Sequence, residues 1–388
     1  MTAAPGDVAV VGGGICGLTT ALTLDRRGID VRVYEAAEEY RPVGAGLLLQ
    51  ANAMLALDEL GVADRVRTAG NALRGGAIRA PDGTELQTFD FDDVERPAVG
   101  HGSVAVHRAD LQQALLDELD APVETGAECV DVTDATSPTV SFADGTTASA
   151  DVVVGADGID SAVRSTVAPD TGVRALDAVV YRAVVDVSLP APRESRGVEV
   201  WGEGTYTGGA AIGGDSFYWF ATEPGRSAAS ATPASDAVPA LRERYGEFPE
   251  PIPTVLDALD PGAVFQTGLR DVPSLDTWSR GRVVLAGDAA HAMLPFAGQG
   301  AAQSLEDAVV LADALASCGD AESAFDRYER ARKPRADRVR AESRWLGRAS
   351  ASRSGVVAGL RNRGIAAVPD ALFRRLRRRR VVGTTLTA

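Results

Sequence analysis

Three short apolar segments of the chain share one pattern. Each is followed by a loop that contains glycine and then by a helix-like stretch, and two of the three loops also contain aspartate. Each segment has the length and the β-branched content of a buried strand. A further alternating segment, residues 31–34, ends at Glu35. Repeated strand–loop–helix units predict an α/β fold whose parallel sheet carries these loops at its carboxyl edge. The apolar segments are residues 7–11, 151–154 and 282–286, and their loops are residues 12–17, 155–158 and 287–300.

The first loop has the sequence GGGICG and fits the pattern G-x-G-x-x-G. In this pattern Gly12 permits a tight turn, Gly14 lets a pyrophosphate approach the backbone, and Gly17 lets the helix pack against the strand. The start of the following helix offers unpaired N–H groups and a partial positive charge to phosphate. Glu35 can accept hydrogen bonds from a ribose. The loop therefore predicts dinucleotide binding, and the alternative is a glycine-rich structural turn.

The remaining segments predict how the chain is divided into domains. Alternating positions indicate a hairpin in residues 75–99, a helix that ends at Leu119, a strand meander in residues 125–154 and a strand-rich region in residues 175–275. Residues 320–350 indicate one long charged helix. We expect a discontinuous nucleotide-binding domain, a mainly antiparallel second domain and C-terminal helices. Their limits are residues 1–74, 100–174 and 276–345 for the first, 75–99 and 175–275 for the second, and 346–388 for the third.

Composition narrows the class of protein. The chain has 388 residues, of which 45% are hydrophobic, which is enough for two folded lobes. No apolar run approaches the roughly 20 residues that cross a membrane, and the segment before the first strand is too short for a signal peptide. The three cysteines, Cys16, Cys129 and Cys318, have no metal-binding spacing. We therefore expect reduced thiols, no metal and a cytoplasmic location.

The charge is strongly acidic. The net charge is −15, and Lys333 is the one lysine among 39 basic residues. Such a surface suits a salt-rich cytoplasm, because salt screens the repulsion between carboxylates; the alternative is a GC-rich genome that favours arginine codons. An acidic surface also repels nucleic acid. The arginine-rich segment 373–380 either packs on the protein's own acidic surface or docks on an anionic membrane.

The three loops together carry a resemblance to a known family. The N-terminal G-x-G-x-x-G, the sequence GADG at residues 155–158 with Ser161 and Arg164, and the sequence GD at residues 287–288 occur in the order and at the spacing of single-component FAD-dependent aromatic hydroxylases (group A flavoprotein monooxygenases). This family includes para-hydroxybenzoate and salicylate hydroxylases. Residues 200–204 and 217–222 are more closely similar to zeaxanthin epoxidase and FAD-dependent urate hydroxylase types. The resemblance implies the para-hydroxybenzoate hydroxylase-like fold, with a Rossmann-like FAD-binding domain and an antiparallel substrate domain.

The resemblance also implies the cofactors and the residues that bind them. FAD is the expected cofactor, and NADH or NADPH is expected to dock transiently, since the chain has no second G-x-G-x-x-G. Backbone N–H groups at the helix start near residue 300 would face the flavin ring, and Gly44 and Gly46 would allow the flavin to move or form an ordinary turn. The expected cofactor-binding residues are Gly12, Gly14, Gly17, Glu35, Arg108, Asp157, Arg164, Asp288, Pro295, Gly298, Gln299 and Gly300.

The implied reaction is insertion of one oxygen atom of O2 into a small or lipophilic substrate through a flavin C4a-hydroperoxide. Tyr218, Gln299 and Arg182 are the candidate catalytic residues, although Tyr218 would equally suit a strand core and Arg182 a sheet edge. The pocket candidates are Tyr206, Tyr218, Phe220 and Phe296. Urate hydroxylase types carry an arginine and an acid where this chain has Tyr206 and Phe296. Both departures remove charge, which argues against urate and favours an apolar ligand, aromatic or isoprenoid.

Other functions fit the same fold. The main alternative is a flavin-dependent reductase of isoprenoid double bonds, like geranylgeranyl reductases; a non-catalytic FAD protein is another. His291 follows the sequence GDAA but is not expected to act as a base. The sequence is compatible with a monomer or a homodimer.

Overall fold

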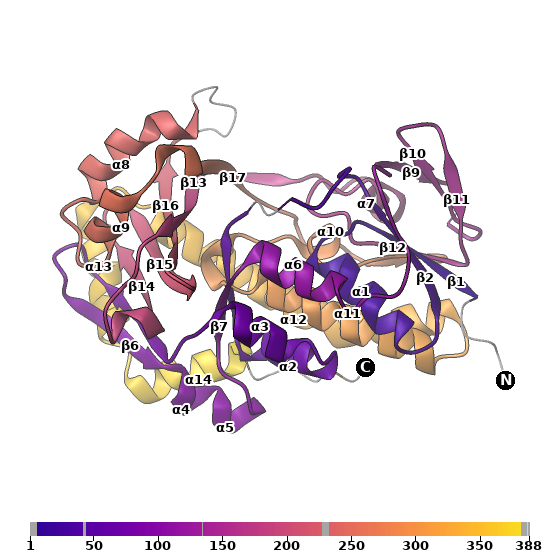
Figure 1. The fold of residues 1–388 in the computed structure, drawn as a ribbon, viewed down its shortest axis with the longest axis horizontal. Helices are drawn as coiled ribbons and strands as arrows, with labels where there is room; N and C mark the ends of the chain where they lie inside the picture. The colour runs from indigo at the N-terminus through magenta and orange to yellow at the C-terminus, as the bar shows by residue number, and fades with distance from the viewer. Residues whose placement is uncertain (1–5, 42–43, 134, 227–232, 382–385, 387–388) are drawn as a thin grey trace.

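The computed structural model describes residues 6–41, 44–133, 135–226, 233–381 and 386. Figure 1 shows an elongated molecule with one sheet near the N-terminus, a second sheet at the opposite end, and long helices running between them. Residues 42–43, in the loop before Gly44, and residues 227–232, in the region predicted to be rich in strands, lie outside the described part.

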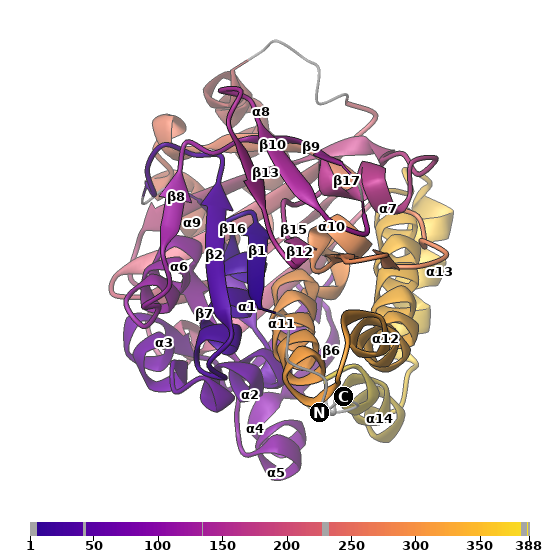
Figure 2. The same cartoon turned by 90° about the vertical axis from the view of Figure 1, so that its right-hand side faces the viewer.

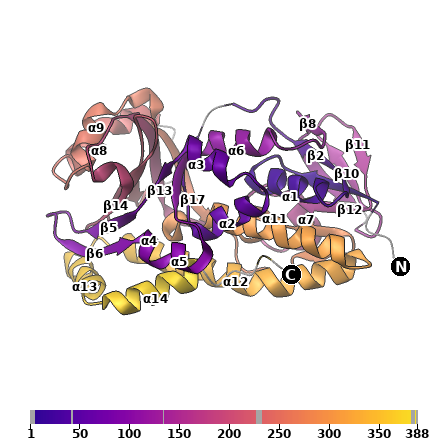
Figure 3. The ribbon, with the colours of Figure 1, turned by 60° about the horizontal axis from the view of Figure 1, so that its bottom comes forward.

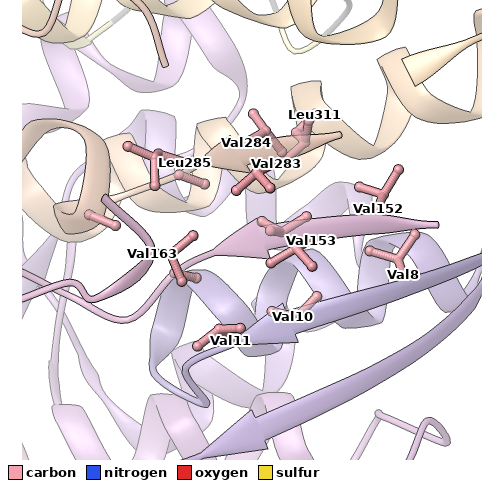
Figure 4. Close-up of a cluster of buried hydrophobic side chains, with 14 of the residues drawn as sticks. Val8, Val10, Val11, Val152, Val153, Val163, Val283, Val284, Leu285 and Leu311 are labelled. Atoms are coloured by element: carbon pink, nitrogen blue, oxygen red, sulfur yellow. The ribbon is translucent and has the colours of Figure 1, made fainter. Parts of the chain in front are cut away.

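The three apolar segments form neighbouring parallel strands. They lie in a six-stranded sheet with the order β18-β19-β12-β1-β2-β8, in which β19, β12, β1 and β2 are parallel to one another. The prediction from the apolar pattern is therefore confirmed, and the three glycine-containing loops leave the same edge of the sheet. Figure 4 shows valines of these strands packed into one apolar layer with Leu311 of the following helix. The strands are β1 (Asp7–Val11), β2 (Asp30–Glu35), β8 (Val123–Thr125), β12 (Val152–Gly155), β18 (Ser279–Arg280) and β19 (Val283–Leu285).

Helices and a small sheet enclose this core. Helix α11 (Gly300–Ser317) packs against α1 (Ile15–Asp25) and against α12 (Ala321–Ser350), as Figure 2 shows. The single long helix predicted from the charged C-terminal pattern is confirmed as α12. The antiparallel meander β9 (Cys129–Thr133), β10 (Thr139–Phe142) and β11 (Thr147–Ser149) contributes apolar side chains to the same core.

The second sheet has seven strands in the order β17-β13-β16-β15-β14-β5-β6. Its neighbours are antiparallel except for the parallel pair β14 and β5, so the predicted mainly antiparallel sheet is confirmed. One face packs on α8 (Val238–Tyr245) and α9 (Ile252–Ala258) around Trp219 and Tyr245. The strands are β5 (Gly75–Arg79), β6 (Glu85–Asp90), β13 (Arg174–Asp186), β14 (Arg196–Trp201), β15 (Tyr206–Gly213), β16 (Ser216–Pro224) and β17 (Phe265–Asp271).

Short elements connect the two sheets. A three-stranded sheet with the order β3-β7-β4 lies between them, and none of the described helices is long and apolar enough to cross a membrane. The remaining elements are β3 (Gly46–Leu49), β4 (Asn71–Ala72), β7 (Val104–His107), α2 (Ala51–Glu59), α3 (Ala63–Ala69), α4 (Phe91–Val94), α5 (Arg96–Val99), α6 (Arg108–Leu116), α7 (Val163–Val167), α10 (Asp288–His291), α13 (Gly355–Ala366) and α14 (Asp370–Val381).

Three boundaries differ from the sequence predictions. The end of the predicted hairpin is helical, because the Asp90 side chain accepts hydrogen bonds from the backbone N–H groups of Asp92 and Asp93 and starts α4. Helix α6 ends at Leu116, before the predicted Leu119. Helix α12 runs without a break across the limit expected at residues 345/346. Figure 3 shows α13 and α14 passing along β6 toward α12, so the C-terminal helices contact both halves of the molecule.

Candidate active site

A cavity of about 970 Å³ joins the loops of the parallel sheet to one face of the seven-stranded sheet. Most of the residues predicted from the sequence line it. Gly17 and Arg164 do not. The predicted residues in its wall are Gly12, Gly14, Glu35, Arg108, Asp157, Arg182, Tyr206, Tyr218, Phe220, Asp288, Pro295, Phe296, Gly298, Gln299 and Gly300.

The first loop is built from glycines for steric reasons. Gly12 has a positive φ of 102°, and a Cβ atom there would lie 2.5 Å from the carbonyl oxygen of Ala156. A Cβ atom on Gly17 would lie 1.8 Å from the carbonyl oxygen of Gly12, so Gly17 serves the packing of α1 on β1 and not the cavity wall. Gly14 precedes the first turn of α1, and nothing lies within 4 Å of the position of its Cβ atom. Open space at a helix N-terminus fits a pyrophosphate.

Glu35 ends β2 at the edge of this loop. Its carboxylate accepts hydrogen bonds from the backbone N–H of Gly13 at 2.6 Å and of Ala37 at 2.8 Å. Burial, followed by the charge of Glu35, raises the pKa of the nearby Tyr40 to about 12, so this hydroxyl stays protonated. A carboxylate accepts about four hydrogen bonds, which leaves Glu35 able to bind ribose hydroxyls.

The second loop presents a buried acid to the cavity. Asp157 Oδ2 accepts a hydrogen bond from the backbone N–H of Val163 at 3.1 Å, whereas Asp157 Oδ1 is buried and lacks a partner among the described residues. Burial raises the pKa of Asp157. An unpartnered buried oxygen is costly, so this atom fits a ligand that donates a hydrogen bond.

Arg164 has a position different from the expected one. The resemblance implies that Arg164 binds the cofactor, but its side chain is buried beneath the loops, near Asp157 and outside the cavity wall. It donates hydrogen bonds to the carbonyl oxygens of Ile159 at 2.7 Å and Ala289 at 3.2 Å. Arg164 therefore ties the second loop to the third. The positively charged side chain in the cavity wall at this end is Arg108, at the start of α6.

The third loop brings Asp288 and the start of α11 to the cavity. Burial raises the pKa of Asp288, and the nearby His291 and Arg108 oppose this effect. Gly298 takes a positive φ of 60°, and the side chain of Gln50 donates hydrogen bonds to the carbonyl oxygens of Ala297 at 3.3 Å and Gly298 at 3.2 Å. These hydrogen bonds hold the loop in place. The first N–H groups of α11 have no partner within the helix, and Gly300 and Ala301 line the cavity.

The Gln299 side chain is held in a buried network, so the role predicted for this residue falls to its backbone N–H. It is 1% exposed, and its Oε1 atom accepts hydrogen bonds from Asn52 at 3.0 Å and from Gln303 at 2.9 Å. Only the backbone of Gln299 is available to the cavity. Asn52 also contacts Glu306, so these side chains link the loop to a buried network of charges.

That network lies between α10, α11 and α12. Arg332 is 1% exposed and pairs with Asp307 at 2.8 Å and with Glu306, while Arg335 pairs with Glu306 at 2.8 Å. His291, also 1% exposed, pairs with Asp307 behind the loop. His291 is not among the residues that line the cavity. No local pattern in the sequence indicates this network, because Glu306 and Asp307 lie on a helix whose other residues are mostly small or apolar.

Four aromatic rings form the substrate side of the cavity. The ring centroid of Tyr206 lies 4.9 Å from that of Phe220 and 5.4 Å from that of Phe296. The ring centroids of Tyr218 and Phe220 are 6.1 Å apart. Trp219 between them is fully buried on the opposite face. The strand-core alternative therefore applies to Trp219, whereas Tyr218 and Phe220 face the cavity.

The wall of the substrate pocket also carries charged groups. Arg182 lies beside Tyr218, where its charge opposes the rise in pKa that burial causes in the tyrosine. Glu199, Arg377 and Arg380 also line the cavity. The alternation of β14 could have indicated Glu199, because Val198 and Val200 face the core. The two arginines come from α14, far away in the sequence, and no local pattern indicates their position.

Comparison with known proteins identifies the family. Residues 6–343 match the model of a family described as "FAD binding domain". The chain is 37% identical to aurachin C monooxygenase/isomerase of Stigmatella aurantiaca over 85% of this chain and 86% of that protein. It is 35% identical to 2-heptyl-3-hydroxy-4(1H)-quinolone synthase of Pseudomonas aeruginosa over 97% of this chain and 98% of that protein.

A solved structure agrees with this assignment. Klebsiella pneumoniae HpxO complexed with FAD and uric acid superposes with a TM-score of 0.88 at 26% identity, covering 98% of this chain and 97% of that chain. The glycine loops, the unpartnered oxygen of Asp157 and the open helix N-termini all fit FAD. The chain belongs to the FAD-binding-domain family of FAD-dependent monooxygenases.

Proposed function

We propose that this flavoprotein uses NADH or NADPH and O2 to insert one oxygen atom into an oxygen-bearing nitrogen heterocycle. The observation that carries the proposal is the continuity of the cavity, which runs from the nucleotide-type loops to an aromatic pocket. The names of the relatives support monooxygenation of aromatic compounds and give no support to a reductase of isoprenoid double bonds.

The residues of the chain would position the cofactor. Gly14 and the start of α1 would hold the FAD pyrophosphate, Glu35 the ribose and Asp288 the ribitol chain. The N-terminus of α11 would stabilise negative charge on the reduced ring without a titrating side chain. When bound, FAD supplies the transfer of electrons from NAD(P)H and the activation of O2.

Two compounds named for the relatives, the product of a synthase and a bound ligand, suggest the substrate class. A 4(1H)-quinolone and uric acid are both flat heterocycles that carry ring nitrogen and oxygen. The aromatic walls formed by Tyr206, Phe220 and Phe296 suit the faces of such a ring. The charged groups Arg182 and Glu199 suit its polar edges.

The test follows the oxygen atom. FAD-loaded protein is given NADH or NADPH and a panel of 4(1H)-quinolones and hydroxybenzoates under ¹⁸O₂, and the products are weighed by mass spectrometry. We expect substrate-dependent O2 uptake and one ¹⁸O atom in the product. A product that gains two hydrogen atoms without ¹⁸O, formed equally well in the absence of O2, would favour a reductase.

A matched pair of variants tests the cofactor site. Gly14→Val fills the open space at the start of α1, and we expect it to lose FAD. Gly172→Val is the control, because Gly172 is exposed, lies outside the cavity and also has nothing within 4 Å of its Cβ position. Equal FAD content in the two purified variants would contradict the assignment.

We also propose peripheral contact between α14 and an anionic membrane. Leu372 and Leu376 are 46% and 51% exposed on this helix, and Arg374, Arg375 and Arg378 are exposed beside them. Exposed leucines next to arginines favour an interfacial helix. Arg377 and Arg380 are left out of this contact, since Arg377 pairs with the buried Glu95 and Arg380 pairs with the half-buried Glu342.

A further inference from the structure

A row of side chains crosses the substrate face of the seven-stranded sheet. Glu199 of β14 pairs with Gly208 of β15, Gly208 pairs with Phe220 of β16, and Phe220 pairs with Arg182 of β13. Residues directly opposite each other on neighbouring strands point to the same face. The row therefore places an acid and a guanidinium on one surface, three strands apart, with a glycine and an aromatic ring between them.

The middle of the row is a flat floor. A Cβ atom on Gly208 would lie 3.2 Å from the Cζ atom of Phe220, so the Phe220 ring extends over the glycine. Tyr206 packs against the same ring, with centroids 4.9 Å apart. Neighbouring strands are about 4.8 Å apart, so the Cα atoms at the two ends of the row lie roughly 14 Å apart. Once the lengths of the Glu199 and Arg182 side chains are taken from this distance, the remaining space suits one flat ring system with a hydrogen bond at each edge.

Glu199 supplies the acceptor at one end. Its Oε2 atom accepts a hydrogen bond from Trp201 Nε1 at 3.1 Å, and the Tyr206 hydroxyl donates a second one. Burial raises the pKa of Glu199, although the charges of Arg380 and Arg377 oppose the effect. Two donors leave acceptor capacity on a carboxylate that lines the cavity. Among the described wall residues that come from this sheet, Glu199 is the one acid.

Arg182 supplies the donor at the other end. Its Nη1 atom donates a hydrogen bond to Thr267 Oγ1 at 2.8 Å, and the guanidinium also interacts with Tyr218. A guanidinium has five N–H donors in a fixed plane, so further donors remain for an oxygen atom of a ligand. Thr267 and Tyr218 therefore orient Arg182 while it still faces the cavity.

We propose that Glu199 and Arg182 determine substrate specificity by holding opposite edges of one flat heteroaromatic ring. The ring donates an N–H to Glu199 and presents a carbonyl or hydroxyl oxygen to Arg182, while Phe220 and Tyr206 lie against its face. This inference rests on the proposed function, because it assigns the substrate edge contacts in the same cavity.

The test measures binding of two probes that differ only at the donor. 4(1H)-Quinolone and N-methyl-4-quinolone are titrated into FAD-loaded protein, and the Kd of each is taken from the change in flavin absorbance. We expect the wild-type protein to bind the N–H probe at least about tenfold more tightly, since a hydrogen bond to a buried charged group is lost on methylation. In Glu199→Leu the preference should fall to about twofold or less, and Glu199→Gln, which keeps an acceptor and the shape, should lie between them.

Two further variants separate the contribution of Glu199 to the binding preference from that of Arg182. Glu203→Gln changes an exposed acid that lies outside the cavity and should keep the wild-type preference. Arg182→Met should weaken both probes by a similar factor, because both carry the oxygen. The proposal is overturned if the wild-type protein does not distinguish the probes, or if both Glu199 variants keep the wild-type preference. Because the readout is binding, failure of oxygen transfer in the ¹⁸O experiment would refute the proposed function without deciding this result.

Discussion

Arg332 offers the strongest test of how the buried network supports the cofactor loop. It donates to Asp307 at 2.8 Å, to Glu306, and to Gln303 Oε1 at 2.8 Å, with 1% of its surface exposed. Arg332→Met keeps a similar length and removes the charge, leaving two buried carboxylates with one fewer cation. Removing one partner of a buried ion pair costs about 3–5 kcal/mol. Arg335 still pairs with Glu306, so we expect the lower end, about 3 kcal/mol.

The assay is urea unfolding at a fixed excess of FAD, followed by tryptophan fluorescence. The control is Arg330→Met on the same helix: Arg330 and Asp326 are 3.8 Å apart, with side chains 74% and 65% exposed. An exposed pair of this kind contributes at most about 1 kcal/mol. If the two variants differed by less than about 1 kcal/mol in free energy of unfolding, the network would not have the stabilising role that its geometry implies.

The same network fixes the direction of a pH effect. Burial alone would raise the pKa values of Glu306 and Asp307. The charges of Arg332 and Arg335 hold the pKa of Glu306 below the usual carboxyl range. His291 and Arg332 do the same for the pKa of Asp307. A depressed pKa stabilises the fold fully above the unfolded-state value near about 4, and this contribution is lost as the pH falls through the folded-state value. The stability difference between the wild-type protein and Arg332→Met should therefore shrink below about pH 4; a constant difference would contradict the argument.

Three further outcomes are expected. The unfolding midpoint should be higher in molar KCl than at low salt, because the net charge of −15 repels itself, and equal midpoints would argue against salt adaptation. Gly17→Ala should lower the FAD content of the purified protein, because the new Cβ atom would lie 1.8 Å from the carbonyl oxygen of Gly12. The ratio of flavin to protein absorbance measures this content, and a normal value would show that α1 can shift. Removing residues 373–388 should reduce pelleting with anionic liposomes, and identical pelleting of the two forms would refute membrane docking. The same truncation deletes the ion pair between Arg377 and Glu95, so thermal melting of both forms checks that the comparison is made on folded protein.

The arginines of the C-terminal helix show how one composition serves two environments. Arg377 lies over the rings of Phe89 and Phe91, at 4.9 and 4.2 Å from their centroids, and pairs with the buried Glu95 at 2.7 Å. Arg378 beside it is exposed. Residues next to each other on a helix face directions about 100° apart, so a continuous basic segment is divided between the interior and solvent. This division explains why α14 both closes the cavity and presents charge outward.

The sequence by itself determined the parallel sheet, its loops and the cofactor class. These features follow local patterns: apolar strands, the close approach of Gly17 to Gly12 within one loop, and an acid such as Glu35 at the end of a strand are all evident from neighbouring residues. The antiparallel second sheet was also evident, because its alternation repeats over short distances.

Only the tertiary structure decided which polar groups face the ligand. The Gln299 side chain turns into a buried network, Arg164 ties two loops together, and Glu199 becomes a pocket acid because β14 and β16 lie in one sheet. Arg377 reaches the cavity from the far end of the chain. The alternation of β14 shows which face of the strand carries Glu199, but the contacts of Gln299, Arg164 and Arg377 depend on residues far apart in sequence. No local pattern of hydrophobic and polar residues contains that information.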